Sequence, residues 1–168
     1  MTAVEIVPGQ PGAVDRIVEM HRLYYAAAWG FGPGFADEVA TEMAEFLGRF
    51  DPARDGFWTA LVDGRVVGAV SIDGTGATGA TGVPDAEARL RWFIVDPACH
   101  GGGIGRALLD RAVAFCRAAG HRRVELWTFA GLDAARHLYE AAGFRLIEEK
   151  ESDPWGFKVR FQVFRADF

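Results

Sequence analysis

The stretch HGGGIG, residues 100–105, combines a histidine with four glycines at the start of a segment of helical periodicity. The first turn of a helix leaves backbone N–H groups without partners and carries about half a positive charge, so it is a natural seat for a phosphate. Glycines add the conformational freedom that lets a ligand approach the main chain closely. The stretch therefore predicts an anion cradle, with a plain tight turn as the alternative.

Neighbouring residues exclude two other phosphate-binding motifs. The dinucleotide fingerprint G-x-G-x-x-G, started at Gly101, needs Gly or Ala at the position of Arg106. The nucleotide-triphosphate loop needs Gly-Lys followed by Ser or Thr, and this stretch has neither. The predicted cradle therefore matches neither nucleotide motif.

The predicted strand, proline turn and helix around HGGGIGRALL resemble the acyl-CoA-binding motif of the GCN5-related N-acetyltransferases. The family consensus of Gln or Arg, two residues, Gly, one residue, then Gly or Ala falls on His100, Gly103 and Gly105. A second signature, LDAARHLYEAAGFRLIEE at residues 132–149, is similar to the family helix that lies over the thioester end of the cofactor. The segments HRLYYAAAWGFGPGF, LRWFIVDP and WGFKVRFQVF look closest to acetyltransferase domains often fused to MarR-type regulators, whose DNA-binding half we expect to be missing here.

This resemblance implies both a fold and a function. We expect a single-domain α/β protein over residues 1–168, with a central mixed, mostly antiparallel sheet flanked by helices and with splayed strands that form the acyl-CoA cleft. The implied activity moves an acetyl group from acetyl-CoA to a primary amine of a small molecule, amino acid or peptide, by direct attack and without a metal. Two alternatives stay open: a non-catalytic acyl-CoA sensor and a partner-dependent regulatory module.

The cofactor-binding residues follow from the same resemblance. The backbone of Phe93, Ile94 and Val95 would pair with the pantetheine arm as a missing strand does, with an ordinary buried strand as the alternative. Successive N–H groups of residues 101–105, helped by Arg106, would bind the pyrophosphate. The whole expected set is Phe93, Ile94, Val95, His100, Gly101, Gly102, Gly103, Ile104, Gly105, Arg106, Asp133, Ala135 and Tyr139.

Tyr139 is expected to protonate the departing thiolate of coenzyme A, or only to pack on the cofactor. Two positions depart from the family pattern. His100 replaces the usual Gln or Arg, which makes a positive charge there conditional on pH. Leu132, beside Asp133, replaces an asparagine that contacts pantetheine in relatives, so that hydrogen bond is expected to be lost or made by the backbone.

A catalytic base is harder to find in the sequence. In the histone-type branch a glutamate occupies the position of Arg89, so the usual base is absent. Glu87 on the same predicted strand and Glu125 on the next are candidate bases, and water molecules are the alternative. Alternation places Glu87, Arg89, Arg91 and Phe93 on one face. Arg89 and Arg91 are expected to hold a carboxylate of the acceptor, or to be surface charges.

Aromatic residues between positions 24 and 35 lie where family members build one wall of the acceptor pocket. Tyr25, Trp29 and Phe31 are the expected substrate contacts. Core packing is the alternative that their spacing favours. The glycines between them would suit a movable lid.

Hydrophobic patterning predicts the elements that position these residues. Alternation and apolar runs predict strands at residues 2–7, 57–62, 65–72, 88–95, 124–129, 144–149 and 157–168. Helical periodicity predicts helices at residues 14–29, about 35–50, 103–119 and 133–142. Asp63-Gly64 predicts a type I′ hairpin turn. This order of elements indicates an α/β domain around a mixed sheet.

Composition limits the remaining possibilities. Half of the 168 residues are apolar and the formal net charge is −5, which supports one globular domain and gives no overall field for nucleic acid. No apolar run approaches the ~20 residues of a membrane span, and no signal-peptide pattern is visible, so we expect a cytoplasmic protein. Cys99 and Cys116 are expected to be free thiols. A homodimer that pairs the strand 157–168 of two copies is a further expectation.

Overall fold

The computed structural model describes residues 3–75, 88–153 and 158–168. Its elements alternate in the order that the sequence predicts, and their ends differ from the predicted ends by a few residues at most. In chain order they are β1 (Val4–Pro8), a 3₁₀ turn (Pro11–Ala13), α1 (Val14–Trp29), α2 (Pro33–Gly48), β2 (Gly56–Val62), β3 (Arg65–Asp73), β4 (Ala88–Val95), a second 3₁₀ turn (Pro97–Cys99), α3 (Ile104–Ala119), β5 (Arg123–Phe129), α4 (Asp133–Ala141), β6 (Arg145–Ser152) and β7 (Val159–Asp167).

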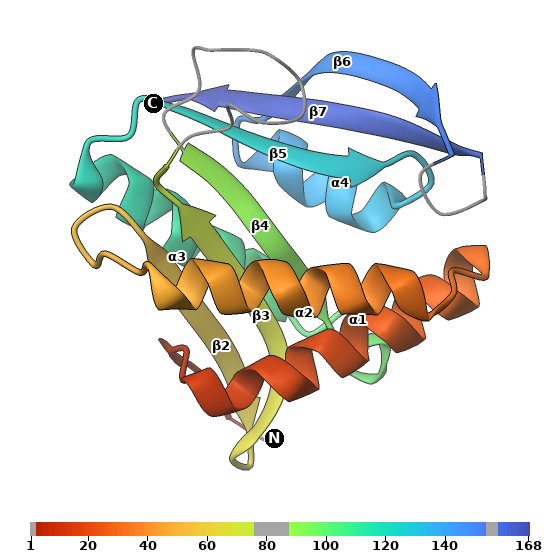
Figure 1. The fold of residues 1–168 in the computed structure, drawn as a ribbon. Coiled ribbons are helices and arrows are strands. Elements are labelled where there is room, and N and C mark those ends of the chain that lie inside the picture. Colours follow the sequence, from red (N-terminus) through yellow and green to blue (C-terminus); the bar gives the residue numbers. More distant parts are fainter. Residues whose placement is uncertain (1–2, 76–87, 154–157) are drawn as a thin grey trace.

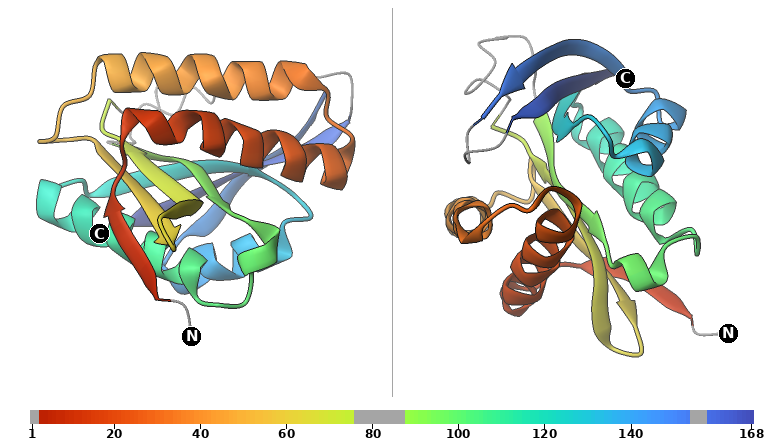
Figure 2. Two further views of the ribbon diagram at one scale, coloured as in Figure 1. Left: turned by 90° about the horizontal axis from the view of Figure 1, so that it is seen from below. Right: turned by 90° about the vertical axis from the view of Figure 1, so that its right-hand side faces the viewer.

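The strands form one sheet in the order β1-β2-β3-β4-β5-β7-β6. Neighbouring strands are antiparallel except for β4 and β5, which are parallel. Helices α1 and α2 cover one face of the sheet, and α3 and α4 cover the other (Figures 1 and 2). The predicted α/β fold with a mixed, mostly antiparallel sheet is confirmed.

The two central strands separate soon after they begin to pair. Residues 88–90 of β4 lie beside residues 124–126 of β5, and no ladder joins the two strands beyond this point. Figure 1 shows β4 and β5 beginning close together and diverging along their length. The splay leaves the β5-facing edge of residues 91–95 without a strand partner, so the predicted opening in the sheet is present.

A β-bulge in β4 changes which side chains share a face. The register with β3 shifts between Ala69 and Ser71, and Trp92 has a φ of 51°, in the left-handed region. Arg89, Arg91 and Trp92 therefore face α1 and α2, whereas Phe93 packs with the cluster on the α3 side. The expectation that Phe93 shares a face with Arg89 and Arg91 is wrong, because one extra residue reverses the alternation.

Two apolar clusters hold the helices on the sheet. Helix α3 buries the stripe Ile104, Leu108, Leu109, Ala112 and Cys116 against the inner strands. On the other face, α1 and α2 bury side chains such as Ile17, Met43 and Phe46. Each such side chain contributes roughly 1.5–3 kcal/mol by leaving water. The splay is thus fixed between two packed layers.

The position of β7 corrects the expectation about a dimer. Strand β7 is paired on one side with β5 and on the other with β6, so it has no free edge. The expected pairing of residues 157–168 between two copies is therefore wrong; the sheet edges are β1 and β6. No helix in the described ranges is both long and apolar enough to cross a membrane.

Candidate active site

A cavity of about 630 Å³ lies beside the start of α3. The end of β4, the glycine turn, the first turn of α3 and the first two turns of α4 surround it. The predicted cofactor residues that line it are Phe93, Ile94, Val95, His100, Gly101, Gly103, Ile104, Gly105, Arg106, Asp133, Ala135 and Tyr139. Gly102 is in the turn but not in the cavity wall. We call this space the cofactor cavity.

The glycine turn offers a row of free donors to the cofactor cavity. Gly101 and Gly103 have φ values of 84° and 78°, in the left-handed region that glycine adopts without strain. Helix α3 makes its first backbone bond from the N–H of Ala107 to Gly103. Within the described chain, the N–H groups of residues 101–106 donate to no backbone acceptor. This is the arrangement that binds a diphosphate at a helix start.

Gly105 allows the tight packing around the turn. A Cβ at this position would lie 3.1 Å from Leu138 Cδ1 and 3.4 Å from Phe93 Cζ, so the Leu138 side chain would have to move by a few tenths of an ångström. Asp96 fixes the turn from the other side, because its carboxylate accepts from the N–H of Ala98 and pairs with Arg16 at 2.8 Å. The cradle is therefore held on both flanks.

His100 has a role that its position in the motif did not reveal. Its Nε2 lies 3.0 Å from the carbonyl oxygen of Val95, and because a carbonyl only accepts, Nε2 carries the proton that it donates there. This bond ties the turn to the end of β4. A contact with phosphate would then have to come from Nδ1, so the predicted phosphate role of His100 stays a prediction.

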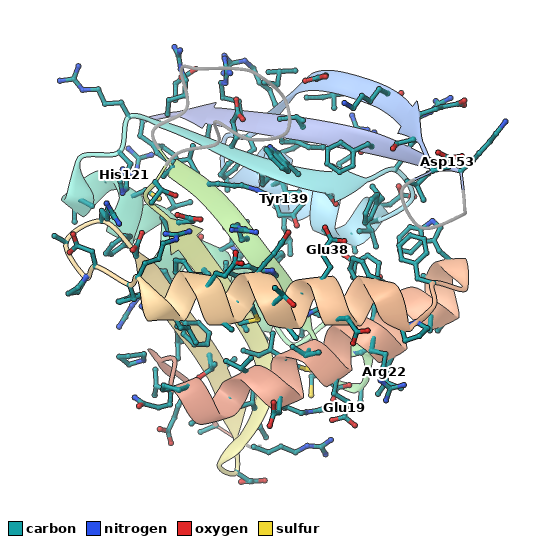
Figure 3. The ribbon with its side chains drawn as sticks, viewed as in Figure 1. Glu19, Arg22, Glu38, His121, Tyr139 and Asp153 are labelled. Atoms are coloured by element: carbon teal, nitrogen blue, oxygen red, sulfur yellow. The ribbon has the colours of Figure 1, made fainter. Side chains whose placement is uncertain are left out.

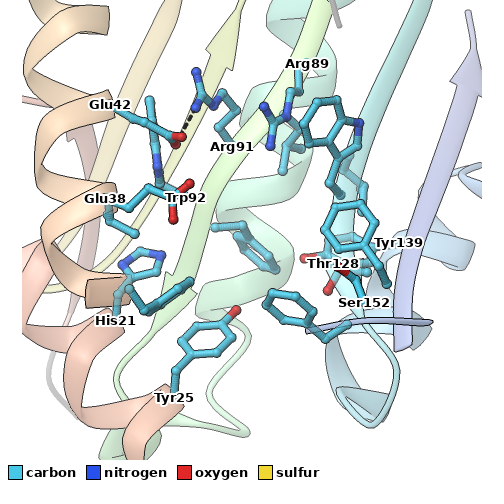
Figure 4. Close-up of a pocket in the computed structure, with 18 of the residues that line it drawn as sticks. His21, Tyr25, Glu38, Glu42, Arg89, Arg91, Trp92, Thr128, Tyr139 and Ser152 are labelled. Atoms are coloured by element: carbon cyan, nitrogen blue, oxygen red, sulfur yellow. Dashed lines mark hydrogen bonds and ion pairs between the residues drawn. The ribbon is translucent and has the colours of Figure 1, made fainter. Parts of the chain in front are cut away.

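A second cavity of about 420 Å³ lies on the other face of the splay, under α1 and α2 (Figure 4). We call it the acceptor cavity. It is lined by His21, Tyr25, Phe35, Glu38, Val39, Glu42, Arg89, Leu90, Arg91, Trp92, Phe93, Leu126, Trp127, Thr128, Phe129, Tyr139, Lys150, Ser152 and Phe161. Figure 3 shows Glu38 on α2 and Tyr139 near the opening between β4 and β5.

Three side chains line both cavities: Tyr25, Phe93 and Tyr139. Tyr139 is 5% exposed and packs its ring against Phe93 and Phe164 at centroid distances of 5.7 and 6.0 Å. Burial raises the pKa of Tyr139 well above its ordinary value, so the hydroxyl keeps its proton at neutral pH. A protonated phenol is therefore available where the two cavities meet.

The two arginines of β4 have different environments. Arg91 donates to Glu42 at 2.6 Å and to Asp73 at 3.1 Å. Arg89 instead places its guanidinium carbon 3.4 Å from the ring centroid of Trp127. Burial would raise the pKa of Asp73, but hydrogen bonds from Arg49 and from Thr75 outweigh it and lower that pKa to about 2.

Of the two predicted bases, the structure places only Glu125, and it lies outside the described wall of the acceptor cavity. Glu125 is fully buried, pairs with Arg165 at 2.6 Å and is not part of the described wall. Glu87 lies outside the described residues. Their catalytic roles stay predictions.

His21 is a candidate functional residue that the sequence reasoning missed. Its ring lines the acceptor cavity, and Nδ1 lies 2.8 Å from the carbonyl oxygen of Ile17, to which it donates. Nε2 is then an acceptor and has no hydrogen-bond partner among the described residues. Burial lowers the pKa of His21 to about 4, against the opposing effect of the bond to Ile17, so the ring is neutral at pH 7. The spacing of His21 from Ile17 and Tyr25 on one helical face was the available signal.

The three aromatic residues expected to contact the substrate differ in whether they line a cavity. Tyr25 lines the cavities, and Trp29 and Phe31 stack near it at centroid distances of 5.4 and 6.0 Å. Trp29 and Phe31 are not part of the described cavity wall, so they support Tyr25 from behind rather than contact the cavity.

Both cysteines are free thiols, as expected. Cys99 lines the cofactor cavity, whereas Cys116 lies in the core, where burial raises its pKa to about 12. Across residues 3–75, 88–153 and 158–168, no three His, Cys, Asp or Glu side chains gather as metal ligands would.

The sheet splays beside a row of free helix-start amides, which is the arrangement that the resemblance to acyl-CoA-dependent acyltransferases implies. The model of the acetyltransferase (GNAT) family matches residues 15–144. The chain therefore belongs to the GNAT family of acetyltransferases.

Individual relatives agree with this assignment. An uncharacterised N-acetyltransferase from Methanocaldococcus jannaschii is 30% identical over 138 residues, which cover 82% of this chain and 58% of the relative. An N-acetylaspartate synthetase from Danio rerio is 34% identical over 112 residues, 66% of this chain and 37% of the relative. The chain thus spans between about a third and about three fifths of these two relatives.

A solved structure shows the same fold. An acetyltransferase from Salmonella typhimurium, determined with its cofactor acetyl-CoA, superposes with a TM-score of 0.72. The match covers 98% of this chain and 94% of that chain at 16% identity.

Proposed function

We propose that this protein transfers an acetyl group from acetyl-CoA to a primary amine. The observation that carries the proposal is the row of free N–H groups at residues 101–106, which opens into a cavity that meets a second cavity at Tyr139. The cofactor's diphosphate would bind the amides, and its thioester would reach the junction. The amine would enter from the acceptor cavity.

The reaction proceeds by direct attack within a ternary complex. The amine nitrogen forms a bond to the thioester carbonyl carbon, and the C–S bond breaks. The departing thiolate takes a proton from the hydroxyl of Tyr139. The attacking amine gives up one proton through water molecules in the acceptor cavity, where the unprotonated Nε2 of His21 accepts a hydrogen bond, and this proton restores the hydroxyl of Tyr139.

The acceptor is a small amine or a peptide amine. The name of the Danio rerio relative says that it makes N-acetylaspartate, whose amine is that of an amino acid. An amino acid is accordingly one acceptor to test first. The kinship with MarR-fused domains and a cytoplasmic location stay predictions.

An acyl-CoA sensor is the second candidate, favoured by the absence of Glu125 from the described wall of the acceptor cavity and by the commitment of His100 to Val95. Calorimetric titration with acetyl-CoA, combined with a thiol-release assay over a panel of amines, distinguishes the two. Amine-dependent release of thiol supports the transferase, and binding without release supports the sensor. A stable acetyl adduct on Cys99, detected by mass spectrometry, would contradict direct transfer.

A further inference from the structure

Arg89 is a partly buried cation that has no anionic partner among the described residues. No carboxylate of the described residues lies within ion-pair distance of it, and its Nε has no hydrogen-bond partner. Its guanidinium group stacks on Trp127, which holds the group flat against the cavity wall. Figure 4 shows Arg89 at one end of the acceptor cavity, with Tyr25 toward the other end.

The surrounding charges are already matched to one another. Asp73 accepts from Arg49 at 2.8 Å and from Arg91 at 3.1 Å, and Glu42 binds Arg91. Glu125, the register partner of Arg89 on β5, accepts from Arg165. Arg89 is thus the arginine of this wall whose charge no described carboxylate balances.

A ligand that supplies the counter-charge would stabilise this partly buried guanidinium, whose charge no described carboxylate balances. Burial, and next the charge of Arg91, lower the pKa of Arg89 to about 9, yet the group still carries its charge at pH 7. Its flat fork suits a carboxylate, which it can bind through two parallel hydrogen bonds. The stacking on Trp127 would orient the fork before the ligand arrives.

The opposite wall offers the complementary charge. Glu38 and Glu42 project from α2 toward the cavity, across from Arg89 (Figure 4). Tyr139 lies on the side where the thioester would arrive. The amine of the acceptor would enter on the side of Glu38, while Arg89 holds its carboxylate.

We propose that Arg89 is the carboxylate-binding residue of the acceptor cavity, so that the acceptor is an amine that also carries a carboxylate. Arg91 is a positioning residue that holds β4, Asp73 and α2 together. This inference rests on the proposed transfer reaction for its substrate class. The binding of a carboxylate at Arg89 can also be measured without turnover.

The test compares amino acids with their own carboxamides. We expect the wild-type protein to prefer the carboxylate, by kcat/KM, by roughly 10- to 100-fold, the range of a charge-assisted hydrogen bond. In Arg89→Gln this preference should fall at least about 10-fold, mainly through KM, and Arg89→Lys should retain part of it. Because each variant meets the same substrate pair, the different basicity of the two amines cancels.

A matched variant controls for the loss of a positive charge. Arg65, exposed at the start of β3, lines neither cavity, so Arg65→Gln should keep the wild-type preference. Thermal unfolding of all variants checks that they fold. A preference that stays within about 2-fold of wild type in Arg89→Gln overturns the proposal.

Calorimetry on the CoA-saturated protein separates this proposal from the proposed function. If no amine is acetylated but amino acids still bind at least about 10-fold more weakly to Arg89→Gln than to wild type, the transfer reaction fails and the carboxylate site stands. If amines are acetylated equally well with and without a carboxylate, the transfer reaction stands and the carboxylate site fails. If no amino acid binds to the wild-type protein and none is acetylated, both fail.

Discussion

The cofactor cavity and the acceptor cavity differ in the chemical groups that line them. The cofactor cavity presents main-chain amides from consecutive residues of one turn, backed by apolar side chains from β4 and α4. The acceptor cavity presents charged and aromatic side chains from α1, α2, β4 and β5. A cradle of consecutive residues is visible in the sequence as glycine spacing, whereas a wall assembled from separate elements depends on how those elements pack.

The largest effect is expected where the backbone does the binding. Gly103→Val forces a β-branched residue to a φ of 78° at the start of α3 and displaces the amides around it. Loss of two charge-assisted hydrogen bonds should raise the Kd for acetyl-CoA by roughly 10³-fold, as measured by calorimetry. Gly64→Val imposes similar strain at a φ of 75° in the β2–β3 turn and should cost stability but not affinity. If Gly103→Val and Gly64→Val bound acetyl-CoA with equal affinity, the main-chain amides would not be what distinguishes the cofactor cavity from the acceptor cavity.

The folding stability should depend on acidic pH through His21, which lines the acceptor cavity. Unfolded His21 has a pKa of 6.5 and the folded ring one of about 4, so between these values the unfolded chain binds a proton that the folded chain does not. Stability should therefore fall as pH drops from 6.5 to 4, by about 3 kcal/mol, and change no further through this group below that range. Urea unfolding across this range measures the slope.

His21→Phe should remove that part of the slope. His137→Phe replaces an exposed histidine on α4 and should keep the wild-type slope. A wild-type slope in His21→Phe would mean that the neutral ring is not what makes the acceptor side acid-sensitive.

The junction of the cavities is tested by removing one hydroxyl. Tyr139→Phe keeps the packing against Phe93 and should lower kcat roughly 10²-fold with little change in the KM for acetyl-CoA. Tyr25→Phe should instead change the KM of the acceptor. Pre-steady-state release of the thiol measures the rate of the chemical step. An unchanged rate in Tyr139→Phe would mean that another group protonates the thiolate.

The smallest predicted effect is a difference in folding stability between variants of the two arginines that line the acceptor cavity. Arg91→Gln deprives Asp73 and Glu42 of a partner and should cost about 2 kcal/mol of stability in urea unfolding. Arg89→Gln breaks no ion pair among the described residues and should change stability by less than about 1 kcal/mol. Equal losses would show that Arg89 is as structural as Arg91.

The sequence was most informative where structure is local. Asp63 and Gly64 both have positive φ values, as the predicted type I′ turn requires, and α3 starts within one residue of the prediction. The amphipathic stripes of α1 and α3 also placed both helices against the sheet. These features depend on neighbouring residues, which a pattern of a few positions captures.

The sequence analysis missed features that depend on contacts between different strands and helices. The bulge at Trp92 is a mismatch between β3 and β4 and has no local signature, so the face of Phe93 was assigned wrongly. The difference between Arg89 and Arg91 is set by Glu42 and Asp73, which come from α2 and β3. His21 looked like one more residue of an apolar helix face, because its free nitrogen is apparent only once the cavity is known.

The narrow overlap of the two cavities has a consequence for how such proteins diversify. Among the described residues the cavities share Tyr25, Phe93 and Tyr139. Residues of α2 and β5 line the acceptor cavity and not the cofactor cavity. If the proposed transfer reaction holds, substitutions on these two elements can change the choice of acceptor without changing the wall that would bind the donor.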